Sequence, residues 1–247
     1  MQFVSLTPIV GATDETNSLE ITVDTILSTC GEDIDSIILV RPGNASDECK
    51  LKISELMNKY GSKVREIVQT EPGIGGAVRD SVKESASSHI MPFPGDLAID
   101  VDCVKAMIDK AKIYPDSYVK SSRWLIKGSF TGYPFFRREF NRAAQVFLRI
   151  LFHSKVTDLT NPVGTMPVDM FNSIDWKEQH FLFLPEMVLV PVRLGIDIIE
   201  IPTKCTARRL EGKSKNSFIK TAMYLKVAFR VRFTHKNKLL KNDSKNT

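Results

Sequence analysis

The chain has 247 residues, of which 43% are hydrophobic and 26% are charged, a composition typical of one globular domain with a sizeable core. It excludes disordered, collagen-like and coiled-coil proteins. The four cysteines stand far apart without a C-x-x-C pair, which predicts neither a zinc ribbon nor a disulfide framework and fits a cytoplasmic compartment. The first residues do not resemble a signal peptide, and no uncharged apolar run approaches the ~18 residues of a membrane span.

Charge is divided unevenly along the chain. Residues 208–247 contain twelve Lys and Arg but two acids, a net charge of +10, whereas residues 1–207 carry −5. A basic end predicts a polyanionic partner or an anionic surface. No nucleic-acid-binding signature accompanies the charge, so we expect no nucleic-acid partner. The composition of residues 236–247 is that of a solvated, partly disordered tail.

Short β-rich runs alternate with helical patterns, which predicts an α/β fold with a mostly parallel sheet flanked by helices. We expect strands at residues 3–10, 37–40, 64–68, 89–93, 118–121 and 198–201. We expect helices at residues 14–30, 47–60, 77–85, from about 99–102 to 112, and at 135–152, 185–194 and 216–233. Ligands of open α/β sheets bind beyond the carboxyl ends of the strands. One cleft should therefore be bordered by residues 8–15, 41–44, 71–76 and 94–96.

Several short motifs follow one another in an ordered set. They are Ser122-Arg123-Trp124 with Gly128 and Gly132-Tyr133, then residues 157–160, 183–186 with 193–195, 200–202, and 207–215. In order and spacing the set resembles the inverting glycosyltransferases of family 2, which have the GT-A fold. It is most similar to the soluble type related to dolichyl-phosphate mannose synthases and polyprenyl-phosphate glycosyltransferases.

The resemblance implies transfer of a sugar, with inversion, from a nucleotide-sugar to a membrane-associated acceptor, first of all polyprenyl phosphate. It implies a glycosyltransferase domain at residues 1–215, followed by a basic amphipathic helix at 216–235 and a tail at 236–247. The enzyme is then cytoplasmic and peripheral on the inner face of the membrane. Two alternatives stay open: a catalytically degenerate relative that binds a nucleotide-sugar, and a transferase with a soluble glycan acceptor. The sequence also leaves open whether the protein is an oligomer.

Two turns depart from the family pattern. Arg41-Pro42-Gly43-Asn44 stands where the family has Asp-Asp-Gly-Ser, and Pro94-Gly95-Asp96 stands where it has Asp-x-Asp. The resemblance makes Asp96 a catalytic and metal-binding residue for Mg²⁺ or Mn²⁺, with Asp158 or the donor phosphates completing the ligands. Alternatively, Asp96 caps a helix and Asp158 is an ordinary turn residue.

The remaining candidate residues bind the donor or phosphate groups. The predicted donor-binding residues are Pro8, Glu15, Gly43, Gly73, Gly75 and Asp96, although the glycines also suit a tight turn without a ligand. The resemblance places Arg123, Arg137, Arg209 and Lys215 around the donor pyrophosphate and a phosphate-bearing acceptor, with Arg123 and Arg209 catalytic. Glu186 is the candidate base for a hydroxyl acceptor, or else a carboxylate that favours a helix N-terminus.

The last predicted helix is amphipathic. Its apolar stripe consists of Phe218, Ala222, Leu225, Phe229 and Phe233, flanked by Lys220, Lys226, Arg230 and Arg232. Such a helix either lies in the interface of an anionic bilayer or packs its stripe on the body of the protein.

Overall fold

A computed structural model of the protein describes residues 2–207 and 218–241, with side chains of the second range from residue 223 onward. The strands are β1 (Leu6–Gly11), β2 (Ile37–Arg41), β3 (Val64–Val68), β4 (His89–Pro94), β5 (Tyr118–Ser122), β6 (Phe130–Thr131), β7 (Gly164–Pro167), β8 (Ile198–Pro202) and β9 (Cys205–Thr206). The α-helices are α1 (Asn17–Cys30), α2 (Asp47–Tyr60), α3 (Gly73–Lys83), α4 (Cys103–Ile113), α5 (Phe135–Phe152), α6 (Val168–Ser173), α7 (Phe183–Leu194) and α8 (Phe218–Phe233). Short 3₁₀ turns cover Gly61–Lys63 and Lys236–Lys238.

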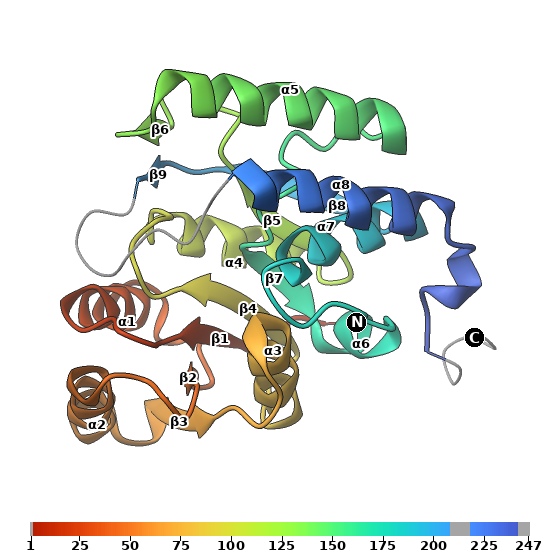
Figure 1. Ribbon diagram of the computed structural model, residues 1–247. Coiled ribbons are helices and arrows are strands. Elements are labelled where there is room, and N and C mark those ends of the chain that lie inside the picture. Colours follow the sequence, from red (N-terminus) through yellow and green to blue (C-terminus); the bar gives the residue numbers. More distant parts are fainter. Residues whose placement is uncertain (1, 208–217, 242–247) are drawn as a thin grey trace.

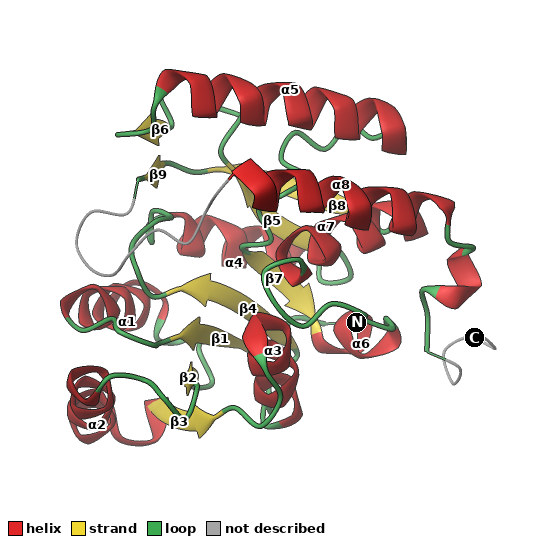
Figure 2. Cartoon of the chain, in the orientation of Figure 1, coloured by secondary structure: helices red, strands yellow, loops and turns green. Residues whose placement is uncertain are grey.

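Seven strands form one central sheet in the order β3-β2-β1-β4-β7-β5-β8 (Figure 1). All neighbouring pairs are parallel except those that involve β7, which runs antiparallel to β4 and β5. A separate two-stranded ribbon pairs β6 with β9. Helices flank the sheet (Figure 2). The predicted α/β architecture with a mainly parallel sheet is confirmed.

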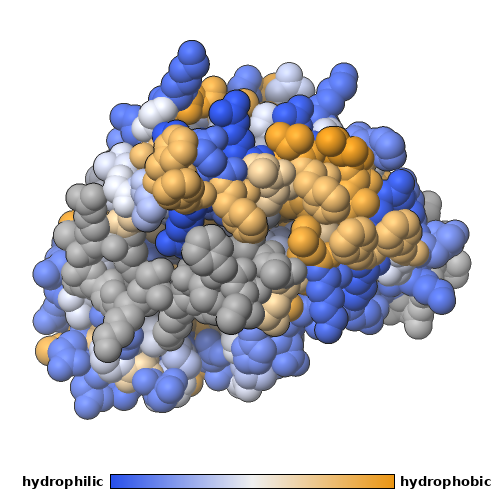
Figure 3. Space-filling model, turned by 45° about the horizontal axis from the view of Figure 1, so that its top comes forward, coloured by the Kyte–Doolittle hydropathy of each residue, from blue (hydrophilic) through white to orange (hydrophobic). Residues whose placement is uncertain are grey.

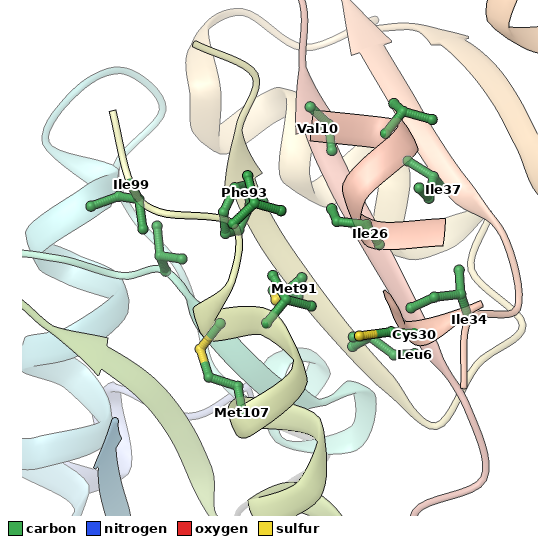
Figure 4. Close-up of a cluster of buried hydrophobic side chains, with 14 of the residues drawn as sticks. Leu6, Val10, Ile26, Cys30, Ile34, Ile37, Met91, Phe93, Ile99 and Met107 are labelled. Carbon is green, nitrogen blue, oxygen red and sulfur yellow. The ribbon is translucent and has the colours of Figure 1, made fainter. Parts of the chain in front are cut away.

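The sheet buries apolar side chains on both of its faces. Leu6 and Val10 of β1 join a cluster with α1, α2 and α4, in which side chains from strands and helices point toward one another (Figure 4). The side chain of Ile9 points to the opposite face of the sheet and joins a second cluster with α3, α6, α7 and α8. This alternation, together with continuous apolar runs such as Ile37–Val40, is what a sheet covered on both faces requires.

Two regions differ from the sequence prediction. Helix α3 begins at Gly73 and not at residue 77, so the glycine-rich turn forms the first turn of the helix. Strand β7 and helix α6 were not predicted. The four-residue strand is too short for a clear periodicity, and Pro167 at its end directly precedes the first residue of the helix.

Helix α8 packs along α7 and also contacts α5 (Figure 1). Val227, Ala228 and Val231 face the core, whereas Leu225 and Phe229 of the predicted stripe are exposed. The helix therefore belongs to the body of the protein, but it buries a different side from the predicted one. None of the helices in the described ranges is long and apolar enough to cross a bilayer.

Candidate active site

The order of the strands reverses between β1 and β4, and both strands end there in register. Gly11 pairs with Pro94, and a Cβ on the next residue, Gly95, would lie 2.8 Å from the Gly11 carbonyl oxygen. Glycine at position 95 thus allows the two backbones to approach closely. A reversal of this kind is where open α/β sheets bind their ligands.

Glu15 and Asp96 lie in the loops that follow these two strands. One oxygen of the buried Glu15 carboxylate accepts hydrogen bonds from the backbone of Thr13 at 2.7 Å and Asp14 at 3.1 Å. Asp96 Oδ1 accepts from Ala98 N at 3.1 Å, and Leu97 between them has a φ of 54°. Leucine rarely adopts this left-handed conformation, and such strain concentrates at functional sites. Both predicted acids therefore lie at the mouth of the strand reversal.

The structure places two other predicted donor-binding residues away from that position. Pro8 lies within β1, which continues to Gly11, so the cleft border begins at Ala12 and Pro8 is part of the buried sheet. Gly43 is in an exposed turn after β2, where a Cβ would meet nothing within 4 Å. Arg41, at the end of β2, forms an ion pair with Glu66 of β3.

The glycines of the predicted phosphate turn are in close contact with another segment of the chain. Gly73 has a φ of 75°, and Gly75 N donates to the Gln179 carbonyl at 2.6 Å. A Cβ on Gly75 would lie 2.6 Å from the Glu178 carbonyl oxygen and 2.9 Å from that of Gln179. Intramolecular packing is thus sufficient to require glycine here, and the predicted contact with a donor stays a prediction.

Arg123 is the best-fixed cation of the site. It follows β5, whose carboxyl end lies at the same edge of the sheet as those of β1 and β4, because β7 is antiparallel to both neighbours. Its Nε donates to Asp158 Oδ2 at 2.7 Å and its Nη2 to Asp158 Oδ1 at 2.9 Å, with a further bond to Thr160 Oγ1 at 3.1 Å. We call this arrangement the Arg123 clamp. The Arg123 side chain keeps 20% of its surface exposed, whereas that of Asp158 is fully buried.

A second buried ion pair, between Lys120 and Glu200, supports the Arg123 clamp. Burial by itself would raise the pKa of Asp158, but the charge and hydrogen bonds of Arg123, together with Lys120, hold that pKa below its usual range. Burial lowers the pKa of Lys120, against the opposing charges of Asp158 and Glu200. Lys120 Nζ donates to the Asp158 carbonyl at 2.8 Å, and Glu200 accepts from the backbone N of Thr157 and Asp158 at 2.6 and 2.9 Å. The loop that carries Asp158 is thereby held from both sides.

Tyr133 lies close to predicted site residues. Burial raises the pKa of its phenol, and the charges of Arg123, Arg137 and Asp96 all act on it. The guanidinium of Arg137, in the first turn of α5, lies 5.6 Å from the centre of its ring. The charges of Asp96, Arg123 and Arg137 thus all reach this phenol, and their joint role in binding a ligand stays a prediction. Arg209 and Lys215 lie outside the described residues.

Glu186 has a different environment. It is fully buried in α7 and accepts hydrogen bonds from Lys177 N and Glu178 N. Its Oε1 also accepts from Arg230 Nη2 of α8 at 2.6 Å. These contacts link the loop before α7 to α8, and they favour a structural role over the predicted role as a base.

Sequence reasoning missed the residues that support the clamp. Gln145 is one of two buried residues of α5; its Oε1 accepts from Leu159 N at 2.7 Å and its Nε2 donates to Thr160 Oγ1 at 2.8 Å. Lys120 stands in the middle of β5, all of whose residues are buried, and Glu200 stands between isoleucines in β8. A charged residue in the middle of a predicted strand is the signal that could have identified them.

The carboxylates do not form a metal site by themselves. Within residues 2–207 and 218–241, no three His, Cys, Asp or Glu side chains are arranged to hold a metal ion. Both oxygens of Asp158 already bind Arg123. The predicted pair of Asp96 and Asp158 thus does not fit a cation held mainly by protein ligands, because hard divalent cations take six or more oxygen ligands.

Comparison with known proteins points to one family. The model of the family "Glycosyl transferase family 2" matches residues 9–174. No curated protein matches the chain. Among solved structures, glucosyl-3-phosphoglycerate synthase from Mycobacterium tuberculosis is similar in fold. Its complex with Mn²⁺, UDP-glucose and phosphoglyceric acid has a TM-score of 0.68 at 14% identity, covering 92% of this chain and 79% of that one.

Two further crystal structures of the same mycobacterial enzyme agree. One of them gives a TM-score of 0.67 at 16% identity, with 92% of this chain and 80% of that one covered. In complex with Mg²⁺ and UDP, it gives 0.63 at 15% identity, with 92% and 76% covered. The fold is therefore the GT-A fold that the sequence predicted.

Proposed function

The chain belongs to glycosyl transferase family 2, and we propose that it transfers a sugar, with inversion, from a nucleotide-sugar to the phosphate of a lipid-linked acceptor, polyprenyl phosphate. In this it would resemble the dolichyl-phosphate mannose synthase type. The acceptor lies at the inner face of a membrane, with which the protein associates peripherally through α8 and the basic end of the chain.

The observation that carries this proposal is that two of the predicted acids, Asp158 and the candidate base Glu186, are paired with arginines. Asp158 and Glu186 are both fully buried, and each is bound to an arginine. A hydroxyl acceptor needs a carboxylate that takes up its proton. A phosphate acceptor is already an ionised nucleophile, so paired acids are no obstacle to its reaction.

The Arg123 clamp supplies what phosphate chemistry needs. Transfer leaves negative charge on the departing diphosphate, and a preorganised cation stabilises that charge without moving. Asp158 fixes the guanidinium fork, and the Arg123 side chain keeps 20% of its surface exposed. Arg137 adds a second cation beside Tyr133. We propose that these two arginines hold the phosphate groups, together with Arg209 and Lys215.

We propose that a divalent cation binds together with the donor. The similar mycobacterial enzyme was crystallised with Mn²⁺ or Mg²⁺ and UDP. With Asp158 bound to Arg123, Asp96 is the protein ligand we propose, and the donor phosphates and water provide the other ligands. The ion would neutralise charge on the leaving diphosphate.

A transfer assay tests the function. Nucleotide-sugars are offered with polyprenyl phosphate, with the matching polyprenol, and with phosphoglyceric acid, each in Mg²⁺, in Mn²⁺ and in EDTA. We expect a product with polyprenyl phosphate and none with polyprenol, and we expect Asp96→Asn to remove most of the metal-dependent activity. Transfer to polyprenol or to phosphoglyceric acid alone would refute the lipid phosphate acceptor. Donor binding without transfer to any acceptor would identify a degenerate relative.

A further inference from the structure

Helix α5 exposes the side that an amphipathic helix normally buries. Of its 18 residues, Gln145 and Leu148 are buried. Phe136 is 82% exposed and Ile150 is 68% exposed, and Phe140 and Phe147 are exposed between them. At 100° per residue these four side chains lie on one stripe, opposite Gln145. A surface helix of a globular protein usually turns such a stripe toward the core.

Helix α8 extends this stripe into a continuous apolar surface. Its exposed residues Leu225, Phe229 and Phe233 lie opposite the buried Val227 and Val231. The rings of Phe147 and Phe229 are 6.1 Å apart, and those of Phe229 and Phe233 stack at 6.2 Å. Apolar residues gather accordingly on this side of the molecule (Figure 3). The surface, here the α5–α8 face, consists of Phe136, Phe140, Phe147, Ile150, Leu225, Phe229 and Phe233.

The charges around the α5–α8 face indicate what covers it. In sequence, α5 and α8 together contain eight Lys and Arg and a single acid, Glu139. Arg142 and Lys226 are exposed toward the flanks of the apolar stripe, and Arg149 is exposed further around α5. A contact between two copies of the same face would bring like charges together. An apolar stripe with a basic rim instead matches an anionic bilayer, whose acyl boundary takes up the rings while its headgroups meet the arginines.

The inner side of the same helix reaches the Arg123 clamp. Gln145 binds Leu159 N and Thr160 Oγ1, and Thr160 Oγ1 accepts from Arg123 Nη2. One helix thus carries exposed rings on one side and a hydrogen bond to the site on the other. We propose that the α5–α8 face docks on an anionic bilayer, with α5 as the main docking element, and that Gln145 fixes the Arg123 clamp relative to that surface. The docking stands by itself, whereas the role of Gln145 rests on the proposed transfer to a lipid phosphate.

Vesicle sedimentation tests the docking. Vesicles of phosphatidylcholine with phosphatidylglycerol are compared with phosphatidylcholine alone, for the wild type, Phe136→Ser/Phe140→Ser, and a control variant. The control, Leu51→Ser/Ile113→Ser, removes two side chains that are 63% and 62% exposed on α2 and α4. We expect the wild type and the control to bind the anionic vesicles in a salt-sensitive manner, and the phenylalanine variant to lose at least tenfold in partition coefficient.

Two results would overturn the docking proposal. One is equal binding of the phenylalanine variant and the control. The other is a dimer of the wild type in light scattering that the phenylalanine variant converts to a monomer, because the face would then belong to a second copy of the chain. Nucleotide-sugar binding, followed by thermal shift, serves as the check that all variants are folded and that the donor side is intact.

Steady-state kinetics test the positioning role of Gln145. The acceptors are polyprenyl phosphate in anionic vesicles and a short, water-soluble isoprenyl phosphate. We expect Gln145→Ala to lower kcat at least fivefold on both acceptors with unchanged vesicle binding, and Gln145→Glu, which keeps the acceptor oxygen for Leu159 N, to recover part of it. We expect Phe136→Ser/Phe140→Ser to raise KM for the vesicle acceptor alone. An unchanged kcat of Gln145→Ala would refute the positioning role. Vesicle binding without transfer to any acceptor would refute the proposed function and leave the docking intact.

Discussion

Helices α7 and α5 both carry extensive apolar surface, but only that of α7 is covered by the described chain. Helix α7 buries eight of its 12 residues, including Glu186, whose charge is matched by Arg230. Helix α5 buries two of its 18 residues and exposes a stripe of aromatic rings. The apolar surface of α7 is satisfied within the chain, whereas that of α5 is not. An amphipathic sequence pattern therefore predicts that a helix has an apolar surface, but not whether another part of the same chain covers that surface.

The same contrast separates the two sides of the site. On the donor side, Gly75, Gly95 and Asp80 are enclosed by other segments of the chain, so their conformations are fixed by internal contacts. The Arg123 clamp, by contrast, is bonded to α5, a helix with only two buried residues. Variants of Arg123, Gly75 and Asp80 should therefore differ in how much transfer activity and how much stability they lose.

The largest effect is expected for a variant of Arg123. Arg123→Ala removes the cation from the site and leaves the Asp158 charge buried without its partner. We expect at least tenfold lower transfer, which corresponds to about 1.4 kcal/mol or more of transition-state stabilisation. We also expect the free energy of unfolding to fall by about 3 kcal/mol, because breaking a buried pair strands the other charge. Transfer assays and urea denaturation measure the two effects.

The double variant Arg123→Ala/Asp158→Ala is the control for that experiment. Without the stranded carboxylate, part of the stability should return, while transfer stays low because the cation is still missing. Recovery of activity together with stability would contradict the phosphate-binding role of Arg123. It would also make the clamp a purely structural ion pair, like that of Glu186 and Arg230.

A smaller effect is expected on the donor side, at Gly75. Gly75→Ala places a Cβ 2.6 Å from the Glu178 carbonyl oxygen, so backbone has to move. We expect a loss of about 2 kcal/mol or more in the free energy of unfolding, as for other overpacked sites. Gly43→Ala is the matched control, since nothing lies within 4 Å of its Cβ. Equal stability of the two variants would show that residues 178–179 yield readily, and would weaken the contrast between a rigid donor side and an open α5.

More of the fold than of the site could be predicted from the sequence. Helix 135–152 was predicted with its observed bounds, because its pattern is long and regular. The direction of its apolar face was not predictable, since the period gives the stripe but not the neighbour. For α8, the described part of the stripe identified from spacing, Leu225, Phe229 and Phe233, is exposed, because Val227 and Val231 give an equally apolar side.

In the site, single residues were found but their partners were not. Arg123 and Asp158 were both named, yet with different tasks, as a phosphate ligand and a metal ligand. Their pairing depends on β7 returning antiparallel between β4 and β5, and this strand was not predicted. Gln145 connects to them only through tertiary contact, so no local pattern marks it as part of the clamp.

The smallest effect is a pH dependence on the donor side. Asp80 in α3 accepts hydrogen bonds from Thr70 N, Thr70 Oγ1 and Glu71 N, and so holds the turn before the glycines. Burial by itself would raise the pKa of Asp80, but these bonds and that from Lys83 outweigh it and lower the pKa from 3.8 to about 2.

The folded protein therefore keeps Asp80 ionised at pH values where the unfolded chain has already taken up the proton. The stabilisation is present in full above about pH 5 and is lost as the pH falls toward 2, and it amounts to about 2 kcal/mol. We expect Asp80→Asn to be less stable than the wild type by about that amount at pH 6, and the difference to shrink toward zero near pH 2. Urea denaturation of both proteins across this range measures it. A difference that stays constant with pH would mean that the carboxylate charge does not stabilise the turn, and that α3 is held by its glycine contacts alone.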